Sequence, residues 1–504
     1  MALTEQFIRD TYSKLKNKAE AYISKGNLHK GLLYIHLAAY TNYSFWLSYY
    51  DDEIERLLVK ASMSIKPKTN IAVIPGRCVM LDSLSRYRGG LTVQYVRAII
   101  AAGWDLLYIT EQEMKAPNHV ELYNYLSQFK QITIIEIPKK YSGVDKLQFI
   151  YDEIIKFRAE RVYLHSSSSD SLFPTICYGL PAQIQKFYID IADHGFRMGM
   201  TSCETIFQFR SLGCSIAERY RGIAPEHILY LPFYPVMDTI NFKGYPKDCE
   251  GKKIIFSGGI FWKICDKDDT FFRLSKQLLE QNPQAIIVYA GGGDSKIVKN
   301  KITEYGLKDR FILLGWRDDI CELFRACDIF LNTYPHGGGT MSLYAAHLNK
   351  PILSFIPDDN FPNPIEMFLC QKKYYKVSSV GKDEFLLEAN KLLNSEDYRL
   401  RKITGTFDCV ISPEDFNSMF KEMSISHKSI IAYSKNQIIG DISRHTQEKI
   451  AFHNEQGEYQ MRLVALAGLN SITMKADLLK PFLLKIIPKI KRVISKNGFH
   501  FNRI

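Results

Sequence analysis

Residues 328–357 read DIFLNTYPHGGGTMSLYAAHLNKPILSFIP. Two short apolar runs, at 328–335 and 351–357, lie on either side of a helical pattern at 339–349, and three glycines join the first run to the helix. A strand, a turn, a helix and a second strand in this order are typical of a parallel α/β sheet. Glycine loses more backbone freedom on folding than any other residue, so three in a row indicate that something lies close to this backbone.

The same alternation of short apolar runs and helical patterns precedes this stretch. We expect strands at 252–259, 284–293 and 310–316, and helices at 270–282, 295–306 and 318–327. The first half of the chain is less regular, with strands expected at 70–76, 105–111, 132–138 and 161–167 and a helix within 86–104. Both halves therefore predict a parallel sheet of the Rossmann-like type.

The domain boundaries follow from changes in this pattern. A segment rich in Pro, Gly and charge at 234–253 separates a domain at 70–245 from one at 250–425. Residues 1–65 are helical in pattern and resemble one tetratricopeptide-type unit, but a single such unit needs neighbours to bury its faces. A helical cap packed on the next domain is the interpretation we favour. Residues 426–504 are expected to form a helical tail.

Composition limits the class of protein. The 504 residues are 46% hydrophobic and 13% aromatic, which excludes a disordered chain, and the net charge of +11 favours phosphorylated ligands over nucleic acid. The ten cysteines form no CxxC pair and indicate reduced thiols. The N-terminus lacks the apolar core of a signal peptide, and no apolar run is long enough to span a bilayer. These features predict a cytosolic protein.

The end of the tail, 478–496, alternates lysines with Leu, Ile and Phe and contains two prolines. Such basic amphipathic segments lie on anionic membrane surfaces, which would place the protein at the inner face of the cell membrane. A helix docked on its own protein, with the lysines in water, is an equal alternative.

Glycines and one lysine lie at the ends of the strands in the second half. The three glycines precede a helix start, where unpaired N–H groups and the helix dipole favour phosphate. Ligands of open α/β sheets bind at these carboxyl ends. Candidate phosphate-binding residues are Gly338, Gly339 and Thr340 in this turn, Gly258, Gly259 and Lys263 in GGIFWK, and Gly292 in YAGGGD. For each residue, an ordinary turn or surface position is the alternative.

Taken together, these motifs resemble the C-terminal half of a GT-B glycosyltransferase. FWKI together with GGGTMSLYAAHLNKPIL is most similar to the O-GlcNAc transferase group and its bacterial protein N-glucosyltransferase relatives. The resemblance implies that Lys263 contacts the donor diphosphate and that Gly339, Thr340 and Met341 hold its β-phosphate. It also implies that Trp316 and Arg317 flank the base. The position that usually carries an acidic ribose ligand is Tyr344 here, which puts ribose recognition in doubt.

The first half resembles bacterial GT-B enzymes at IDIADHGFRMGM, 189–200, where Arg197 replaces an aromatic residue. The resemblance implies that His194 takes the acceptor proton or binds the donor, with Asp193 orienting it. The alternative is a buried structural histidine. Candidate acceptor-side residues are Gly89 and Gly90, in RYRGG, and His165, at a strand end.

The sequence thus predicts an α/β, GT-B protein of two tandem Rossmann-like domains with helical ends. The expected activity is transfer of a hexosyl or N-acetylhexosaminyl group from a nucleotide-diphosphate sugar, UDP-linked by preference, to a protein, glycan or lipid-linked acceptor. No metal or other cofactor and no nucleic acid are expected. Two alternatives stay open: a non-catalytic GT-B partner subunit and a nucleotide-sugar epimerase.

Overall fold

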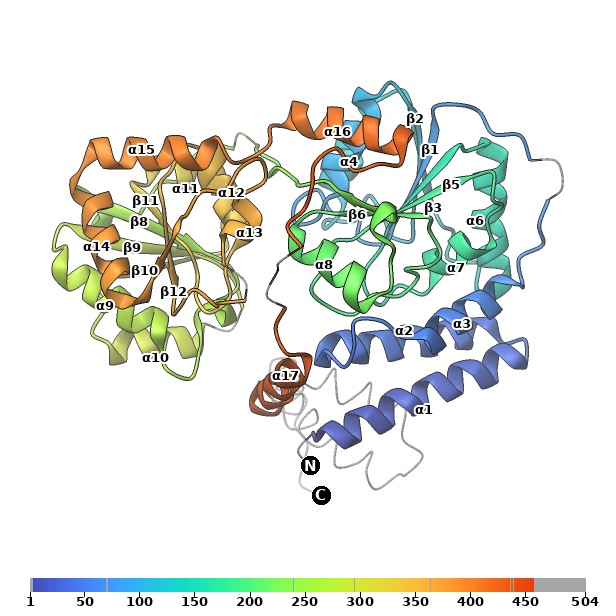
Figure 1. Cartoon of the computed structure of the whole chain (residues 1–504), viewed down its shortest axis with the longest axis horizontal. Helices are drawn as coiled ribbons and strands as arrows, with labels where there is room; N and C mark the ends of the chain where they lie inside the picture. The colour runs from blue at the N-terminus through green and yellow to red at the C-terminus, as the bar shows by residue number, and fades with distance from the viewer. Residues whose placement is uncertain are drawn as a thin grey trace, which may run out of the picture.

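The computed structural model describes residues 3–68, 71–238, 240–293, 295–362, 364–435, 437 and 439–456. Two parallel sheets stand side by side, each with helices around it, and a group of helices lies beneath the first sheet (Figure 1). This arrangement confirms the α/β class with helical ends. The basic segment 478–496 lies outside the described residues.

The first sheet has seven strands in the order β3-β2-β1-β4-β5-β6-β7, all paired in parallel. Its central strands are apolar runs buried on both faces, as expected for a sheet covered by helices on each side, whereas the edge strand β3 has no fully buried residue. They are β1 (Arg77–Asp82), β2 (Asp105–Thr110), β3 (Ile132–Glu136), β4 (Arg161–His165), β5 (Gln185–Ile189), β6 (Thr205–Gln208) and β7 (Ile228–Tyr230).

The strand expected at 70–76 is wrong. The central strand begins one residue later, at Arg77, and the apolar residues before it belong to no strand. Pro75 has no N–H for a strand ladder, and Gly76 turns the chain with a φ of +78°. The two residues that end the apolar run therefore separate it from the strand.

Helices cover the first sheet, and three more form a cap. The covering helices are α4 (Thr92–Ala101), α5 (Val120–Leu126), α6 (Gly143–Phe157), α7 (Leu172–Gly179) and α8 (Ser211–Tyr220). The cap consists of α1 (Glu5–Ser24), α2 (Leu28–Phe45) and α3 (Asp52–Ser62). The cap shares one hydrophobic core with this domain, with α2 against α6 and α3 against α7. The expected helical cap is confirmed.

The second sheet has six parallel strands in the order β10-β9-β8-β11-β12-β13. The strands are β8 (Lys253–Gly258), β9 (Ala285–Ala290), β10 (Phe311–Gly315), β11 (Ile329–Leu331), β12 (Ile352–Ile356) and β13 (Ser378–Val380). Its helices are α9 (Thr270–Gln281), α10 (Lys296–Glu304), α11 (Ile320–Ala326), α12 (Gly339–His347), α13 (Glu366–Leu369), α14 (Gly381–Asn394) and α15 (Glu396–Phe407). Every strand and helix expected between 252 and 357 is present.

The chain passes between the domains more than once (Figure 1). A linker at 231–252 leads into the second domain, and the segment after α15 returns to the first, where α16 (Pro413–Ser426) packs on α4. The buried Gln371 holds both passages: its Nε2 donates to Phe233 O at 2.9 Å, and its Oε1 accepts from Ile411 N at 2.8 Å. Residues 413–425, expected in the second domain, therefore belong to the first.

After α16 the chain runs along the first domain and ends its described part in α17 (Ile442–Gln456), beside the cap.

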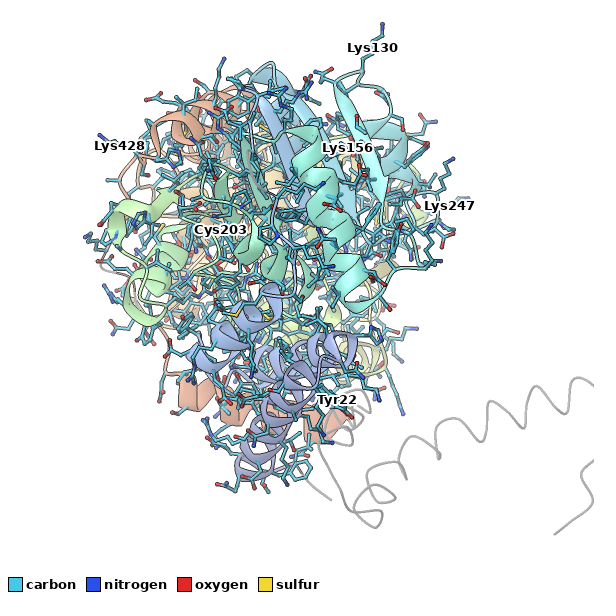
Figure 2. All side chains as sticks on the ribbon, turned by 90° about the vertical axis from the view of Figure 1, so that its right-hand side faces the viewer. Tyr22, Lys130, Lys156, Cys203, Lys247 and Lys428 are labelled. Atoms are coloured by element: carbon cyan, nitrogen blue, oxygen red, sulfur yellow. The ribbon has the colours of Figure 1, made fainter. Side chains whose placement is uncertain are left out.

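Figure 2 shows Lys130, Lys156, Lys247 and Lys428 projecting outward from different parts of the fold. All ten cysteines are free thiols and most are buried, Cys203 among them, as the sequence predicts. Within the described ranges, no helix is both long and apolar enough to cross a membrane.

Candidate functional site

The second sheet changes its direction of winding between β8 and β11, which are neighbours in space. Loops at the carboxyl ends of such strands form the usual ligand crevice. Hydrogen bonds join these loops here: Gly259 N donates to Ala290 O at 3.0 Å, Gly291 N to Gly315 O at 2.9 Å, and His336 N to Lys263 O at 3.3 Å. The ends of β8, β9, β10 and β11 therefore meet at one place.

Close backbone approach accounts for a glycine at the end of β8. A Cβ at Gly258 would lie 2.6 Å from Ala290 O and 3.1 Å from Cε of Met341. A Cβ at Gly292 would lie 3.5 Å from the ring of Trp316, a contact of ordinary length. Gly259 has a φ of +146°, which side chains rarely adopt. Gly258 and Gly259 thus bring loops together, and Gly292 lies beside an aromatic ring.

Protein atoms also explain the glycine run. A Cβ at Gly339 would lie 2.5 Å from Cδ1 and Cε1 of Phe368. Gly338 N donates to Asn332 Oδ1 at 2.9 Å, which fixes the turn before the helix. The neighbour that excludes a side chain at residue 339 is therefore Phe368, a residue of the same domain.

The start of α12 is open for an anion. No side chain caps this helix, and the first N–H to bond within it is that of Ser342, to Gly338 O at 2.9 Å. The N–H groups of Gly339, Thr340 and Met341 lie outside the helical ladder, at the positive end of the dipole. The buried hydroxyl of Ser342 also has no hydrogen-bond partner among the described residues.

Lys263 lies in a 3₁₀ turn, Phe261–Ile264, directly after β8. Its side chain is half-buried, and burial lowers the pKa of its ammonium group. Among the described residues, no side chain or carbonyl group forms a hydrogen bond or ion pair with this ammonium group. A partly desolvated cation normally has an anionic partner. An uncompensated ammonium and an uncapped helix start on adjacent loops therefore point to an anionic ligand.

His336, which the sequence analysis did not single out, lies in the loop between β11 and α12. Its ring packs edge-on against Trp262 with centroids 4.6 Å apart. The ring is accessible to solvent but closely surrounded by protein. Burial, together with the nearby Lys449 and Lys263 charges, lowers the pKa of His336 to about 4. This imidazole is neutral at physiological pH, in a region of positive potential.

Trp316 has a side chain that is free to contact a ligand, whereas the side chain of Arg317 is bonded within the protein. The indole of Trp316 is 80% exposed and lies beside Gly292. Arg317 is occupied: its Nε donates to Asp319 at 2.6 Å, and its Nη1 donates to Gly244 O of the linker at 3.1 Å. The side chain of Arg317 therefore fixes the linker, which corrects its expected place beside a base.

Tyr344 also contacts the linker. Its hydroxyl donates to Val236 O at 2.7 Å, and its ring stacks on Phe324 with centroids 6.0 Å apart. Both the polar and the apolar part of the side chain are thus used in packing. The doubt about ribose recognition at this position is strengthened.

In the first domain, Asp193 and His194 are adjacent but have different environments. Asp193 is buried and binds Arg210 through two hydrogen bonds, Nε to Oδ2 at 2.6 Å and Nη2 to Oδ1 at 2.8 Å. Burial raises its pKa, but Arg210 and His194 outweigh this and lower it. The His194 side chain is 41% exposed, with Nδ1 3.4 Å from Asp193 Oδ1. Its ring lies edge-on to Trp46 at 5.7 Å.

His165 does not line a cleft. It is fully buried at the end of β4, and its Nδ1 lies 3.0 Å from Oδ1 of Asp82 at the end of β1. This corrects the acceptor-side expectation, since no acceptor reaches a ring without solvent exposure. Gly89 and Gly90, by contrast, form an open turn with no atoms around a potential Cβ. The adjacent Arg88 donates to Asp318 O of the second domain at 2.9 Å.

A buried ionic network next to His194 was missed by the sequence analysis. Asp190 accepts from Arg197 at 2.7 Å and from Arg221 at 2.6 Å, and all three side chains are buried. Arg197, which replaces an aromatic residue of the resembling family, therefore supports the loop from inside. Among the described residues, no three His, Cys, Asp or Glu side chains gather as they would to hold a metal ion.

Comparison with known proteins finds a family match in the second half of the chain. Residues 238–401 match the family of group 1 glycosyl transferases. A UDP-Gal:alpha-D-GlcNAc-diphosphoundecaprenol alpha-1,3-galactosyltransferase of Escherichia coli is 35% identical over 65 residues, which are 12% of this chain and 17% of that protein. The chain thus spans less than a fifth of this curated relative.

Solved structures agree in fold. An O-GlcNAc transferase variant of Thermobaculum terrenum matches with a TM-score of 0.51 and 13% identity, covering 88% of this chain and 85% of that one. HepE of Anabaena, solved with UDP and glucose, matches with a TM-score of 0.50 and 13% identity, covering 69% of this chain and 99% of that one. The GT-B fold implied by the sequence resemblance is confirmed.

Proposed function

We propose, on the premise that residues 238–401 form a group 1 glycosyltransferase domain in a GT-B fold, that this protein is a glycosyltransferase. It moves a hexosyl or N-acetylhexosaminyl group from a UDP-sugar to a protein side chain, a glycan or a lipid-linked glycan. The UDP in HepE and the UDP-galactose in the name of the Escherichia coli relative support this choice of donor.

One observation carries the proposal. The ammonium group of Lys263 lacks a partner among the described residues and lies on the loop next to the uncapped start of α12. A diphosphate supplies the negative charge that both groups lack. Trp316 offers an exposed aromatic face beside Gly292, at the same edge of the sheet, for the base.

The chemistry is a displacement at the anomeric carbon. The bond from this carbon to the β-phosphate oxygen breaks, and negative charge grows on the departing diphosphate. Lys263 and the N–H groups of 339–341 stabilise this growing charge. Stabilisation of developing charge by preorganised groups is usually the largest single contribution to catalysis. Because these groups supply the positive charge, the reaction is expected to need no divalent metal.

We assign to His194 the role of accepting the acceptor's proton. Its ring is half-exposed, and its Nδ1 faces the buried Asp193, which leaves Nε2 for the acceptor. Imidazole is the most frequent general base in enzymes. The Arg210 contact holds Asp193 in place, and Asp193 in turn orients the His194 ring through Nδ1.

The test is a thermal-shift titration with UDP, GDP, CMP and their sugars. We expect UDP to raise the melting temperature of the wild type. At a UDP concentration of a hundred times Kd, the free energy of unfolding should increase by about 2.7 kcal/mol. Lys263→Ala should lose most of this gain, and Lys267→Ala, an exposed lysine of the same loop, should keep it. If no nucleotide stabilises the wild type, the donor-site proposal is wrong.

Turnover separates the remaining alternatives. UDP release from a UDP-sugar in the presence of EDTA, lost in Lys263→Ala, supports a metal-independent transferase. UDP binding without turnover for any acceptor or water favours a non-catalytic partner subunit, for which Tyr344 in place of an acidic residue is the specific observation. Conversion of the free UDP-sugar to its epimer would identify an epimerase instead.

A further inference from the structure

Helix α17 lies against the cap (Figure 1). Thr446 Oγ1 donates to Trp46 O at 2.8 Å, and the ring of His445 lies edge-on to the Trp46 indole at 4.5 Å. At the other end, Asn454 exchanges two hydrogen bonds with Leu3, at 2.8 and 2.9 Å. The position of this helix is therefore set by the first domain and its cap.

One side chain of α17 spans the space between the domains. The ammonium nitrogen of Lys449 lies 5.5 Å from the ring centroid of Trp46 and 5.5 Å from that of Trp262. Trp46 belongs to the cap, and Trp262 directly precedes Lys263 in the second domain. Cation–π contacts of this kind contribute roughly 0.5–1 kcal/mol at exposed sites. Lys449 thus brings a positive charge from α17 to the loop that carries Lys263.

Lys449 and Lys263 act on the same ring. His336 packs on Trp262, and the charges of both lysines lower its pKa. His445 adds to this effect, and only Glu448 opposes it. Glu448 is itself bonded to Arg444 at 2.9 Å and lies 3.5 Å from His445 Nδ1. The positive charge around His336 therefore exceeds the negative charge.

We infer that Lys449 is a second cation of the diphosphate site, brought to the crevice by a helix anchored on the opposite domain. This inference rests on the proposed function and assigns a ligand contact outside the matched family segment, 238–401. Lys263 approaches the diphosphate from the β8 loop, the start of α12 from the β11 loop, and Lys449 from across the domain junction. The β-phosphate, which gains charge as the sugar leaves, is the group it binds.

The experiment compares UDP with UMP, which lacks the β-phosphate, by calorimetry on the full chain. Lys449→Ala should weaken UDP binding by about tenfold, the size of one charge-assisted contact, and should leave UMP binding within about twofold. Lys449→Arg should restore most of the UDP affinity. Arg444→Ala removes the same charge from an exposed position of the same helix and should change neither affinity.

Three results would overturn the inference while leaving the proposed function intact. One is unchanged UDP affinity in Lys449→Ala, in a protein whose Lys263→Ala variant does lose affinity. The second is an equal loss for UDP and UMP, which would place Lys449 away from the β-phosphate. The third is a raised KM for the acceptor with unchanged UDP affinity. If the wild type binds neither nucleotide, the proposed function itself has failed.

Discussion

The ring of Phe368 lies so close to Gly339 that a Cβ there would come within 2.5 Å of two ring carbons. The same ring also contacts the first domain, where the guanidinium of Arg210 lies 4.5 Å from its centroid. Arg210 in turn holds Asp193. A continuous series of contacts thus connects the glycine turn of one domain to the loop that carries His194 in the other.

Gly339→Ala is expected to destabilise the protein, because its methyl group cannot be placed without moving the Phe368 ring. Overpacking of this kind costs about 1–3 kcal/mol. We expect a lower midpoint of urea unfolding and weaker UDP binding, since the shift displaces the start of α12. Adding Phe368→Leu should recover part of both losses. Equal stability of Gly339→Ala and wild type would contradict the packing argument.

We predict that Asp193→Asn mainly lowers stability, whereas His194→Ala mainly lowers activity. The first removes the charge that faces a buried guanidinium and should cost on the order of 3 kcal/mol of unfolding free energy. The second removes a half-exposed ring and should cost about 1 kcal/mol or less, mainly the contact with Trp46. Sugar transfer should be abolished in His194→Ala despite its intact fold. A fully active His194→Ala would remove the histidine from the mechanism.

Tyr344→Phe tests whether this residue fixes the linker or binds the donor. Loss of its hydrogen bond to Val236 O should lower stability by about 1 kcal/mol, as for one neutral hydrogen bond. UDP affinity should stay within about twofold of wild type, because the hydroxyl faces the linker. A large loss of UDP affinity without loss of stability would show that Tyr344 contacts the nucleotide after all.

Asp170 gives a prediction with a definite pH sign. Burial, and to a lesser degree Glu111, raises the pKa of its carboxyl group to about 7. The native state therefore holds a proton that the unfolded chain loses near pH 4, and stability falls by about 1.4 kcal/mol per pH unit as pH rises between these values.

Asp170→Asn should remove this dependence while keeping the bond from Leu172 N at 2.9 Å. Relative to wild type, the variant should gain stability steadily from pH 5 to pH 7 and no further above pH 8. Urea unfolding of both proteins at these pH values measures the difference. A constant difference across the range would mean that Asp170 is ionised in the native state throughout.

The sequence predicted the second sheet well because each strand there ends in a clear glycine or polar turn. It failed at β1, where Pro75 and Gly76 end an apolar run that pairs with no strand. Ile71, Val73 and Ile74 have the side chains of a strand but are only half-buried, and side-chain type alone does not show whether a segment pairs. Pairing partners decide the difference, and they are distant in sequence.

The candidate site divides in the same way. Lys263 and the turn at 337–340 could be identified because each lies within a local strand-to-helix motif. Lys449 and Trp46 could not, because they come from opposite ends of the chain and meet only in the folded protein. Nor could packing roles such as that of Arg317 be told from binding roles, since both use the same polar residue types.

The double hydrogen bonding of Gln371 has a mechanical consequence. It fastens the two covalent passages between the domains to one another, at the edge of the molecule opposite α17 (Figure 1). Two bodies joined along one edge keep a single easy degree of freedom, a rotation about that edge. The displacement that such a rotation produces is largest far from the axis, where Lys449 meets Trp262. The contact between Lys449 and Trp262 is therefore the one that such a rotation changes most.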